Sequence, residues 1–385
     1  MSDTFRPTMA ILANRGFAIS NSRIPLIIRM RDAGWRVLLI TTDDSDARAV
    51  ASLGVVLEAV NFYRGGFSIF RDIRAVIRLI RLFARYRPEL VHLFHAKPIL
   101  MGSIAIAAVP GWKPSVVSTI TGLGHPYAEG GLTWRIACIG YRLLMKRCDA
   151  TIFQNQDDLD VFLGRQWIDV GKAILIVSSG VDTRKFRPGR TRSTGTIVLM
   201  LSRLIRQKGV QDFLDAAKIV NAKYPHATFL LAGEIEKDHA DRIGEATIAQ
   251  ATRESGVRYL GFVSNVEKLL STTKILVFPS YYGEGVPRVV LEAAACAVPT
   301  IGADVPGTRE AIDDGITGFL VPPKNHRLLA ERIGQLLDDE ELRVRMGNAA
   351  RRKALAEFDV TLITEKQLDV YRAVLSFAGR DIFGA

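Results

Sequence analysis

Cysteine and long hydrophobic runs are both scarce in this sequence. The three cysteines, Cys138, Cys148 and Cys296, are too few and too scattered for a disulfide framework or a zinc site. The N-terminal stretch MSDTFRPTMAILANRG has too short an apolar run for a secretory signal, and prolines and glycines interrupt the uncharged segment between Lys97 and Lys113. That segment is also shorter than the roughly 20 residues that cross a bilayer. We therefore expect a cytoplasmic protein that is free or lies on a membrane without crossing it.

Motifs that would identify several common classes of protein are absent. No Gly-x-Gly-x-x-Gly follows the first expected strand, which argues against a dinucleotide oxidoreductase. No segment resembles a motif that reads RNA or DNA, so we expect no nucleic-acid partner. The acidic runs DDSD (43–46) and DDLD (157–160) contain Asp-x-Asp, a short metal-binding signature, but such triplets often arise by chance. We expect neither a metal site nor an organic cofactor.

Acidic residues are fewer than basic residues in this sequence. The chain has 51 Lys and Arg residues against 40 Asp and Glu, a net charge of +11, and nearly all of the excess lies within residues 1–185. We therefore expect this half of the chain to meet an anionic partner. Because 385 residues exceed what one hydrophobic core usually serves, two domains are expected.

Short apolar runs alternate with helical patterns in both halves of the chain. Runs rich in β-branched residues that end in Gly, Ser, Thr or Asn are typical of buried parallel strands. Helical spacing predicts helices over 22–34, 70–87 and 209–224. The expected strands are 8–14, 35–42, 90–94, 115–121, 150–155 and 173–180, then 196–203, 227–234, 257–263, 275–280 and 298–303.

This alternation predicts the α/β class, with two doubly wound, Rossmann-like domains facing across a cleft. The polar, proline-bearing stretch KFRPGRTRSTG (185–195) reads as a linker between an N-terminal domain over 1–184 and a C-terminal domain over 196–357. Residues 358–385 carry a long helical pattern that could cross back to the first domain. Ligands of such sheets bind beyond the carboxyl ends of the strands.

Two acids, Glu284 and Glu292, flank a predicted helix start. Pro287 suits the first turn of that helix, and Gly283 and Gly285 would let backbone N–H groups approach a ligand. A helix N-terminus is a site for phosphate. Carboxylates beside a phosphate repel it unless they bind neutral hydroxyls, which sugars supply. The pattern therefore suggests a nucleotide sugar; a solvated helix residue and an ordinary loop acid are the alternative.

A second pair, Arg203 and Lys208, follows the first expected strand of the C-terminal domain. Two fixed cations at a strand end can neutralise the charge that builds on a departing diphosphate. A basic surface loop is the alternative. The position of the pair in the same domain as the two acids favours the first interpretation.

The patterns Arg-x4-Lys and Glu-x7-Glu resemble those of the family-4 retaining glycosyltransferases (GT4), which have the GT-B fold. The segments SRIPLIIRMRDAGWRVLLIT, KPILMGSIAI, STITGLG, IFQNQDD, SSGVDTRKF and GTREAIDDGITGFLVPP each resemble a block of that family, in the expected order. The combination of FHAKP, STITGLG and FQNQDD is most similar to the bacterial branch that makes lipid-linked oligosaccharide, capsule or O-antigen.

The resemblance implies a metal-independent glycosyl transfer that retains the anomeric configuration through an oxocarbenium-like transition state. The donor would be a nucleotide diphosphate sugar, with a UDP-linked and N-acetylated sugar among the expectations. The acceptor would be a sugar on a polyprenyl diphosphate or a growing polysaccharide. The resemblance leaves the sugar, the linkage and the oligomeric state open.

By position, the resemblance also assigns residues to the site. Arg203 and Lys208 would bind the donor diphosphate, Glu292 the ribose, and Glu284 the donor sugar near the reacting centre. Many relatives carry a histidine at the position of Thr121, so Thr121 and the nearby His125 are further catalytic candidates. The other expected donor-binding residues are Gly16, Gly233, Gly283, Gly285, Val286 and Pro287, and the acceptor or cleft candidates are Asn14, Phe17, His95, Lys97 and Asn155.

Two basic helical patterns are candidates to contact a membrane surface. Basic amphipathic helices with aromatic residues suit an anionic bilayer, here the cytoplasmic face of the inner membrane. An ordinary helix with a solvated arginine face is the alternative. The first pattern has Arg71, Arg74, Arg78, Arg81 and Arg85 on one stripe beside an apolar face of Phe70, Ile73, Ile77, Ile80 and Ala84, and the second contains Trp134, Arg135 and Arg142.

Two other functions stay open at this point. A GT-B fold can house a nucleotide-sugar epimerase, which would form its product without an acceptor; the family blocks argue against it. A non-catalytic basic module that binds a membrane or a nucleic acid would also account for the charge. Glycosyl transfer accounts for the charge, the paired acids and the paired cations together.

Overall fold

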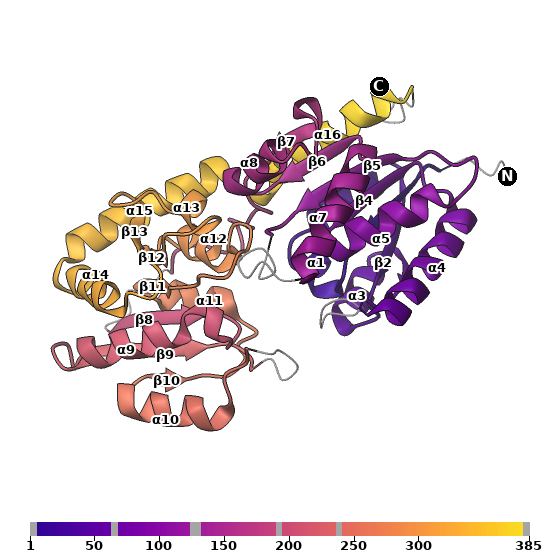
Figure 1. Ribbon diagram of the computed structural model, residues 1–385. Helices are drawn as coiled ribbons and strands as arrows, with labels where there is room; N and C mark the ends of the chain where they lie inside the picture. The colour runs from indigo at the N-terminus through magenta and orange to yellow at the C-terminus, as the bar shows by residue number, and fades with distance from the viewer. Residues whose placement is uncertain (1–5, 63–67, 124–131, 190–194, 236–240, 380–385) are drawn as a thin grey trace. The chain divides into compact units, whose positions relative to one another are not determined.

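A computed structural model of the protein describes residues 6–62, 68–123, 132–189, 195–235 and 241–379. Its chain folds into two compact units (Figure 1). Unit 1 consists of Met1–Ser179 and Thr361–Ala385, and unit 2 of Gly180–Val360. The chain thus enters unit 2 a few residues before the expected linker at 185–195, and the last helix of the chain lies almost wholly in unit 1.

Unit 1 is built on a seven-stranded sheet in the order β3-β2-β1-β4-β5-β6-β7. The strand β1 pairs in parallel with both β2 and β4, so the order of the sheet reverses between β1 and β4. Such a reversal opens a crevice at the carboxyl ends of the two strands. The strands are β1 Thr8–Leu12, β2 Arg36–Thr41, β3 Val56–Ala59, β4 Leu90–Phe94, β5 Ser115–Ile120, β6 Ala150–Phe153 and β7 Ala173–Leu175.

Helices cover both faces of this sheet because side chains alternate between the faces along each strand. Ala10 and Leu12 join a core with α4, α5, α7 and α8, whereas Met9 and Ile11 join a second core with α2, α3 and α16. The helices are α1 Gly16–Ser20, α2 Ile24–Asp32, α3 Ser45–Ala51, α4 Ile69–Tyr86, α5 Ala96–Ala107, α7 Leu132–Leu144, α8 Gln156–Gly164 and α16 Val360–Phe377.

A buried histidine ties α16 to the sheet of unit 1. Nε2 of His92 on β4 lies 2.7 Å from Oγ1 of Thr119 on β5, and its Nδ1 is hydrogen-bonded to the hydroxyl of Tyr371. Burial, reinforced by the charge of Arg23, lowers the pKa of His92 well below its usual value. A neutral imidazole with both nitrogens hydrogen-bonded is a structural element, and it adds a polar contact to the apolar packing of α16 on the sheet.

Unit 2 repeats the plan with a six-stranded sheet in the order β10-β9-β8-β11-β12-β13. Here the order reverses between β8 and β11, which pair in parallel. The strands are β8 Thr196–Leu201, β9 Ala227–Ala232, β10 Arg258–Tyr259, β11 Ile275–Phe278, β12 Thr300–Ala303 and β13 Gly318–Val321. The helices are α9 Val210–Asn221, α10 Glu245–Ser255, α11 Val266–Thr272, α12 Arg288–Ala295, α13 Thr308–Ala311, α14 His326–Asp338 and α15 Glu340–Glu357.

The predicted α/β class with two doubly wound sheets is confirmed. Each expected strand is present: β4 has the expected bounds, and the others have one to five residues fewer than the apolar run. The two strands that the pattern missed, β3 and β13, are four-residue edge strands, and β3 has no fully buried residue. Within the described ranges, no helix combines the length and the apolar character that crossing a membrane requires.

Replacing Tyr371 by Phe tests the tie between α16 and the sheet. The change leaves Nδ1 of the buried His92 without its hydrogen bond, so we expect the free energy of unfolding to fall by about 1–3 kcal/mol. Chemical denaturation at neutral pH measures the change. Tyr86→Phe is the matched control, because the Tyr86 hydroxyl contacts Glu58 at the surface and its loss should have a smaller effect. Equal losses in both variants would contradict the account.

Candidate active site

The predicted donor residues of unit 2 lie on two loops that meet where its sheet reverses. Arg203 and Lys208 follow β8, and Glu284 follows β11. The loops are joined because the backbone N–H of Tyr281 donates to the carbonyl of Gln207 at 2.9 Å. Reversal points at the carboxyl ends of parallel strands are the usual ligand sites of doubly wound sheets. The two sequence patterns thus converge although 76 residues separate Lys208 from Glu284.

The closest contact at this point is an ion pair between Lys208 and Glu284. Lys208 is 4% exposed, and its Nζ bonds to Oε1 of Glu284, which also accepts from Oγ of Ser280 at 3.4 Å. Burial lowers the pKa of Lys208, the Glu284 carboxylate opposes that effect, and Arg203 adds to it. A buried cation needs a nearby counter-charge. In this structure the two side chains predicted to bind the donor neutralise each other.

An aromatic ring brings the two cations of the site together. The guanidinium carbon of Arg203 lies 5.6 Å from the ring centre of Tyr282, and Nζ of Lys208 lies 5.1 Å from it. Cation–π attraction holds both charges at the same ring. The patterns did not single out Tyr282 or Ser280, since a loop residue gives no periodic signal.

Glycine is required at position 233, directly after β9. Its φ is 140°, and a Cβ there would lie 1.7 Å from the carbonyl oxygen of Ser202. The close approach of the two strand-end loops therefore explains this glycine. Gly283, Gly285, Val286 and Pro287 lie on the loop that leads into α12, and Pro287 is the residue that caps its N-terminus.

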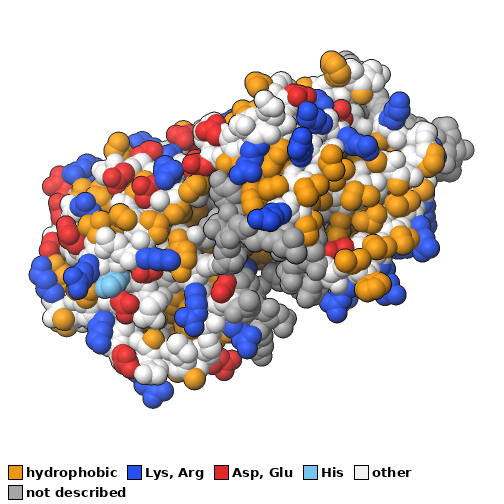
Figure 2. Space-filling model, in the orientation of Figure 1, with side chains coloured by type: hydrophobic (Ala, Val, Ile, Leu, Met, Phe, Trp, Pro, Cys, Tyr) orange, Lys and Arg blue, Asp and Glu red, His pale blue; other side chains and the backbone are white. Residues whose placement is uncertain are grey.

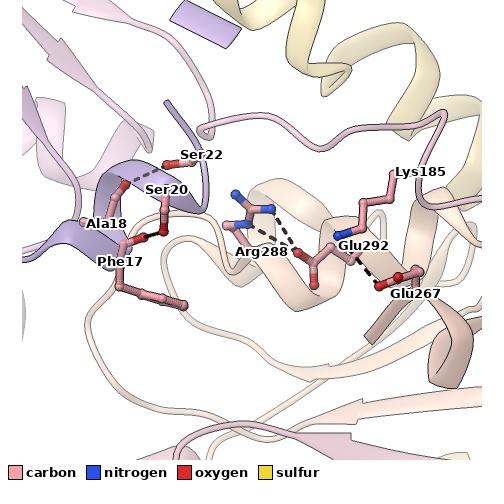
Figure 3. Close-up of polar contacts among 8 residues, drawn as sticks. All are labelled: Phe17, Ala18, Ser20, Ser22, Lys185, Glu267, Arg288 and Glu292. Carbon is pink, nitrogen blue, oxygen red and sulfur yellow. Dashed lines mark hydrogen bonds and ion pairs between the residues drawn. The ribbon is translucent and has the colours of Figure 1, made fainter. Parts of the chain in front are cut away.

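Glu292 lies buried in α12 and pairs with Arg288 one turn earlier (Figure 3). Nη2 and Nε of Arg288 lie 3.1 and 3.3 Å from Oε1 of Glu292. Its Oε2 accepts no hydrogen bond from the residues that the structure describes, so this oxygen is the one that can meet a ligand. Arg288 was missed by the pattern analysis, although its spacing of four residues from Glu292 is a sequence signal.

Opposing effects act on the Glu292 carboxyl. Burial raises its pKa, whereas the charge and hydrogen bonds of Arg288 and the charge of Lys185 lower it, and Glu267 raises it slightly. Lys185 is itself 3.8 Å from Glu267 (Figure 3). Arg288 therefore helps to keep a buried carboxylate ionised.

In unit 1 the predicted residues near β1 are used by the fold. The N–H of Gly16 donates to Oδ2 of Asp44 at 3.0 Å, and a Cβ on Gly16 would lie 2.1 Å from Oδ1 of the same residue. Asp44 in turn caps α3 through the N–H of Ala47. Phe17 is half exposed on α1, where the hydroxyls of Ser20 and Ser22 bond to helix carbonyls (Figure 3). Asn14 lies two residues before this helix, and its carbonyl accepts from the hydroxyl of Thr42 at 3.1 Å.

Two further candidates in unit 1 also have structural partners. Asn155 is buried and caps α8: its Oδ1 accepts from the N–H of Asp158 at 2.7 Å, and its amide donates to the Asp158 carboxylate. Nζ of Lys97 lies 2.9 Å from Asp72. Thr121 directly follows β5, and His125 lies outside the described residues. Within the described ranges, no cluster of three His, Cys, Asp or Glu side chains is arranged to hold a metal ion.

An outer surface of unit 1, here called the α4/α7 surface, combines apolar and basic side chains. Of the apolar stripe expected on α4, Ile80 packs against the core, whereas Phe70, Ile73 and Ile77 are exposed, Phe70 by 89%. The helix buries Ala75, Leu79, Leu82 and Phe83. Figure 2 shows hydrophobic side chains gathered beside basic ones over these helices. The surface consists of Ile69, Phe70, Ile73 and Ile77 on α4, Ile136, Ile139 and Leu143 on α7, and the exposed arginines of both helices.

The expectation that Trp134 contacts a membrane is wrong. Trp134 is 8% exposed and packs against Trp167, with ring centres 5.9 Å apart. An aromatic ring at this position of α7 faces the core, because the helix turns Arg135 and Arg142 outward instead. On α4, Arg78 bonds to Glu58 at 2.8 Å, and Arg85 lies 3.9 Å from the same carboxylate.

Comparison with known proteins places this architecture in one class. The family model "Glycosyl transferase 4-like domain" matches residues 26–167, and "Glycosyl transferases group 1" matches residues 181–353. The crystal structure of Anabaena Alr3699/HepE in complex with UDP-glucose has the same fold: the TM-score is 0.80 at 19% identity, over 95% of this chain and 99% of that one. Unit 1 and unit 2 therefore have the GT-B fold.

The chain belongs to the GT4-type glycosyltransferases, with a 4-like N-terminal and a group 1 C-terminal part. It is 26% identical to the N,N'-diacetylbacillosaminyl-diphospho-undecaprenol alpha-1,3-N-acetylgalactosaminyltransferase of Campylobacter jejuni, over 95% of this chain and 99% of the relative. It is 24% identical to the UDP-Gal:alpha-D-GlcNAc-diphosphoundecaprenol alpha-1,3-galactosyltransferase of Escherichia coli, over 79% of this chain and 80% of the relative.

Removing Arg288 should make stability more sensitive to alkaline pH. Because the folded-state pKa of Glu292 is raised, the folded protein holds this proton more tightly, and stability is lost as pH rises from the unfolded to the folded pKa. Arg288→Ala raises the folded pKa further and widens that window. We expect the loss of unfolding free energy relative to wild type to be larger at pH 8 than at pH 5, by about 1.4 kcal/mol for each unit of added shift.

The control for this measurement is Arg309→Ala, which removes an exposed ion pair with Asp304 at 2.7 Å. Its effect should be small and the same at both pH values, because exposed pairs contribute little to stability. An Arg288→Ala loss that is equal at pH 5 and pH 8 would show that Arg288 does not control the ionisation of Glu292.

Proposed function

We propose that this enzyme transfers a sugar from a UDP-sugar to an acceptor sugar carried on a polyprenyl diphosphate or on a growing polysaccharide. Transfer retains the anomeric configuration and needs no metal ion. The observation that carries the proposal is the group of Lys208, Arg203 and Glu284 where the sheet of unit 2 reverses. The two relatives above support the acceptor class by their names, and the E. coli relative supports a UDP-linked donor.

The donor diphosphate binds at Lys208 and Arg203. Two buried or half-buried cations at one aromatic ring can offset the diphosphate charge that develops as the sugar leaves, a role that a divalent ion has in other enzymes. Binding of the diphosphate gives Lys208 a new partner and so frees the carboxylate of Glu284. Glu284 then accepts hydrogen bonds from the donor sugar, and Oε2 of Glu292 accepts them from the ribose.

Transfer breaks the bond between the anomeric carbon and the diphosphate oxygen and forms one to the acceptor oxygen on the same face. The sugar passes through an oxocarbenium-like state, as in glycoside hydrolysis. The proton of the acceptor hydroxyl leaves to the departing diphosphate. Arg203 and Lys208 hold that diphosphate in place while it accepts the proton.

We also propose that the α4/α7 surface docks the enzyme on the anionic cytoplasmic face of a membrane. A lipid-linked acceptor requires the enzyme to work at a bilayer. The exposed apolar residues Phe70, Ile73 and Ile77 can enter the boundary between headgroups and acyl chains, while the arginines beside them meet anionic headgroups. Charge complementarity thus favours a membrane over a protein partner.

The donor site is tested by thermal shift with UDP, GDP, ADP and UDP-sugars in the presence of EDTA. UDP binds the folded state only, so it should raise the melting temperature of the wild type without metal. Lys208→Ala should lose this shift. Glu284→Gln should keep the shift with UDP, because Lys208 is still present, but lose transfer by a factor of about 100 or more.

The two variants separate diphosphate binding from sugar binding. Loss of the UDP shift in Glu284→Gln would contradict the assignment of this acid to the sugar. A shift that appears only when metal is added would contradict metal-independent binding. A shift with GDP or ADP but not with UDP would overturn the proposal that the donor carries a uracil nucleotide.

Membrane docking is tested by co-sedimentation with vesicles that contain an anionic lipid. The double variant Arg74→Glu/Arg81→Glu should reduce binding at least tenfold, since each near-surface cation contributes about 1 kcal/mol. Neither arginine has an ion-pair partner among the described residues, so the variant leaves the fold intact. Arg345→Glu/Arg352→Glu on α15 is the matched control, with the same spacing on a helix of the same length, 18 residues. Equal binding by both double variants would exclude the α4/α7 surface.

A further inference from the structure

The strand order reverses beside the first strand in both sheets. The proposed donor site uses only the reversal in unit 2. In unit 2 the reversal lies between β8 and β11 and carries Lys208 and Glu284. In unit 1 it lies between β1 and β4. The residue that directly follows β4 is His95. By topology, His95 occupies the place in unit 1 that the loop of Glu284 occupies in unit 2.

The backbone of His95 is strained. Its φ is 70° and its ψ is 155°, a region that residues other than glycine rarely adopt. Hydrogen bonds hold it there from both sides: its N–H donates to the carbonyl of Thr119 on β5, and its carbonyl accepts from the N–H of Ile99 in the first turn of α5. Strain of this kind persists at functional sites where the surrounding structure enforces it. A glycine would fit this position without strain, so the imidazole itself calls for an explanation.

The side chain of His95 differs from that of His92, which lies three residues earlier on β4. Both ring nitrogens of His92 are hydrogen-bonded. Nδ1 of His95 is buried without a hydrogen-bond partner among the described residues, although the side chain as a whole is only half-buried. Burial and the charge of Arg23, which stacks on the Phe94 ring, lower the pKa of His95 to about 4, against the opposing effect of a backbone hydrogen bond at Phe94. The imidazole is therefore uncharged at neutral pH.

Neighbouring strand ends place further polar groups beside His95. Leu12 on β1 is level with Leu93, so Asn14 comes level with His95 when the register is continued. Phe94 is level with Thr119 on β5, so Thr121 comes one position beyond His95. An amide, an imidazole and a hydroxyl thus end three adjacent strands. Uncharged groups of this kind can hydrogen-bond sugar hydroxyls, which carry no charge that a cation would have to neutralise.

We propose that His95 binds the acceptor sugar and orients the hydroxyl that attacks the donor. This inference rests on the proposed function and adds the residue that selects the reacting hydroxyl. The imidazole takes no proton in the net reaction: the hydroxyl proton still leaves to the departing diphosphate as the new bond to the anomeric carbon forms. Strain in the backbone fixes the direction of the ring at the carboxyl edge of the sheet.

The test uses His95→Gly and His95→Asn in the full chain, assayed with a UDP-sugar and a sugar carried on a polyprenyl diphosphate. His95→Gly should melt at or above the wild-type temperature, because glycine relieves the strain, yet lose at least tenfold in kcat/KM for the acceptor. Its thermal shift with UDP should be unchanged. His95→Asn, which keeps a hydrogen-bonding group and tolerates positive φ, should recover part of the loss.

The structural histidine on the same strand supplies the control. His92→Asn should lower the melting temperature, whereas His95→Gly should not. If His95→Gly transfers as well as wild type, or melts lower as His92→Asn does, the residue has no acceptor role. If the wild type binds UDP but transfers no sugar to the polyprenyl-diphosphate-linked acceptor, the proposed acceptor class is wrong. The inference about His95 is then wrong as well.

Discussion

A buried lysine, paired with one carboxylate among the described residues, joins two strand-end loops of unit 2. Lys208 is nearly inaccessible to water, so its charge requires Glu284, and this requirement draws the loop after β8 against the loop after β11. The aromatic ring of Tyr282 and the glycine at position 233 complete the close approach of the strand ends. In the proposed function a diphosphate replaces Glu284 as the partner of Lys208, so the ion pair that holds the loops together marks the proposed donor site.

Both units contain a reversal of strand order in the sheet, but different kinds of side chain lie at the two reversals. Each sheet reverses next to its first strand, and each reversal gathers polar side chains at the carboxyl edge. In unit 2 these side chains are charged, which suits a diphosphate; in unit 1 they are uncharged, which suits sugar hydroxyls. The exposed arginines of the α4/α7 surface contribute to the excess of positive charge within residues 1–185.

Much of the fold could be predicted from the sequence, because buried parallel strands leave continuous apolar runs that end at polar residues. The edge strands β3 and β13 were missed, since four residues at the edge of a sheet leave too short a run. The convergence of Arg203, Lys208 and Glu284 followed from their positions after strands. Their mutual pairing could not be predicted, because it depends on how two loops pack. The strain at His95 gave no signal either, since only a glycine at that position would have indicated positive φ.

The buried face of α4 is a second feature that the sequence pattern did not predict. The spacing identified a stripe that includes Phe70, Ile73 and Ile77, but it did not indicate that the helix buries Leu79, Leu82 and Phe83. The helix has apolar residues on more than one side, so periodicity alone leaves its orientation undecided. The apolar residues left outside are a finding of the structure, and they turn a basic stripe into an amphipathic surface.

The most direct test of the account is to determine the product of the reaction by mass spectrometry and NMR. The enzyme is supplied with UDP-sugars and a sugar carried on a polyprenyl diphosphate, with EDTA present. We predict a product one sugar longer, in which the new linkage has the anomeric configuration of the donor, together with one UDP released for each sugar transferred. An inverted linkage, or transfer that stops when metal is removed, would contradict the donor site described above.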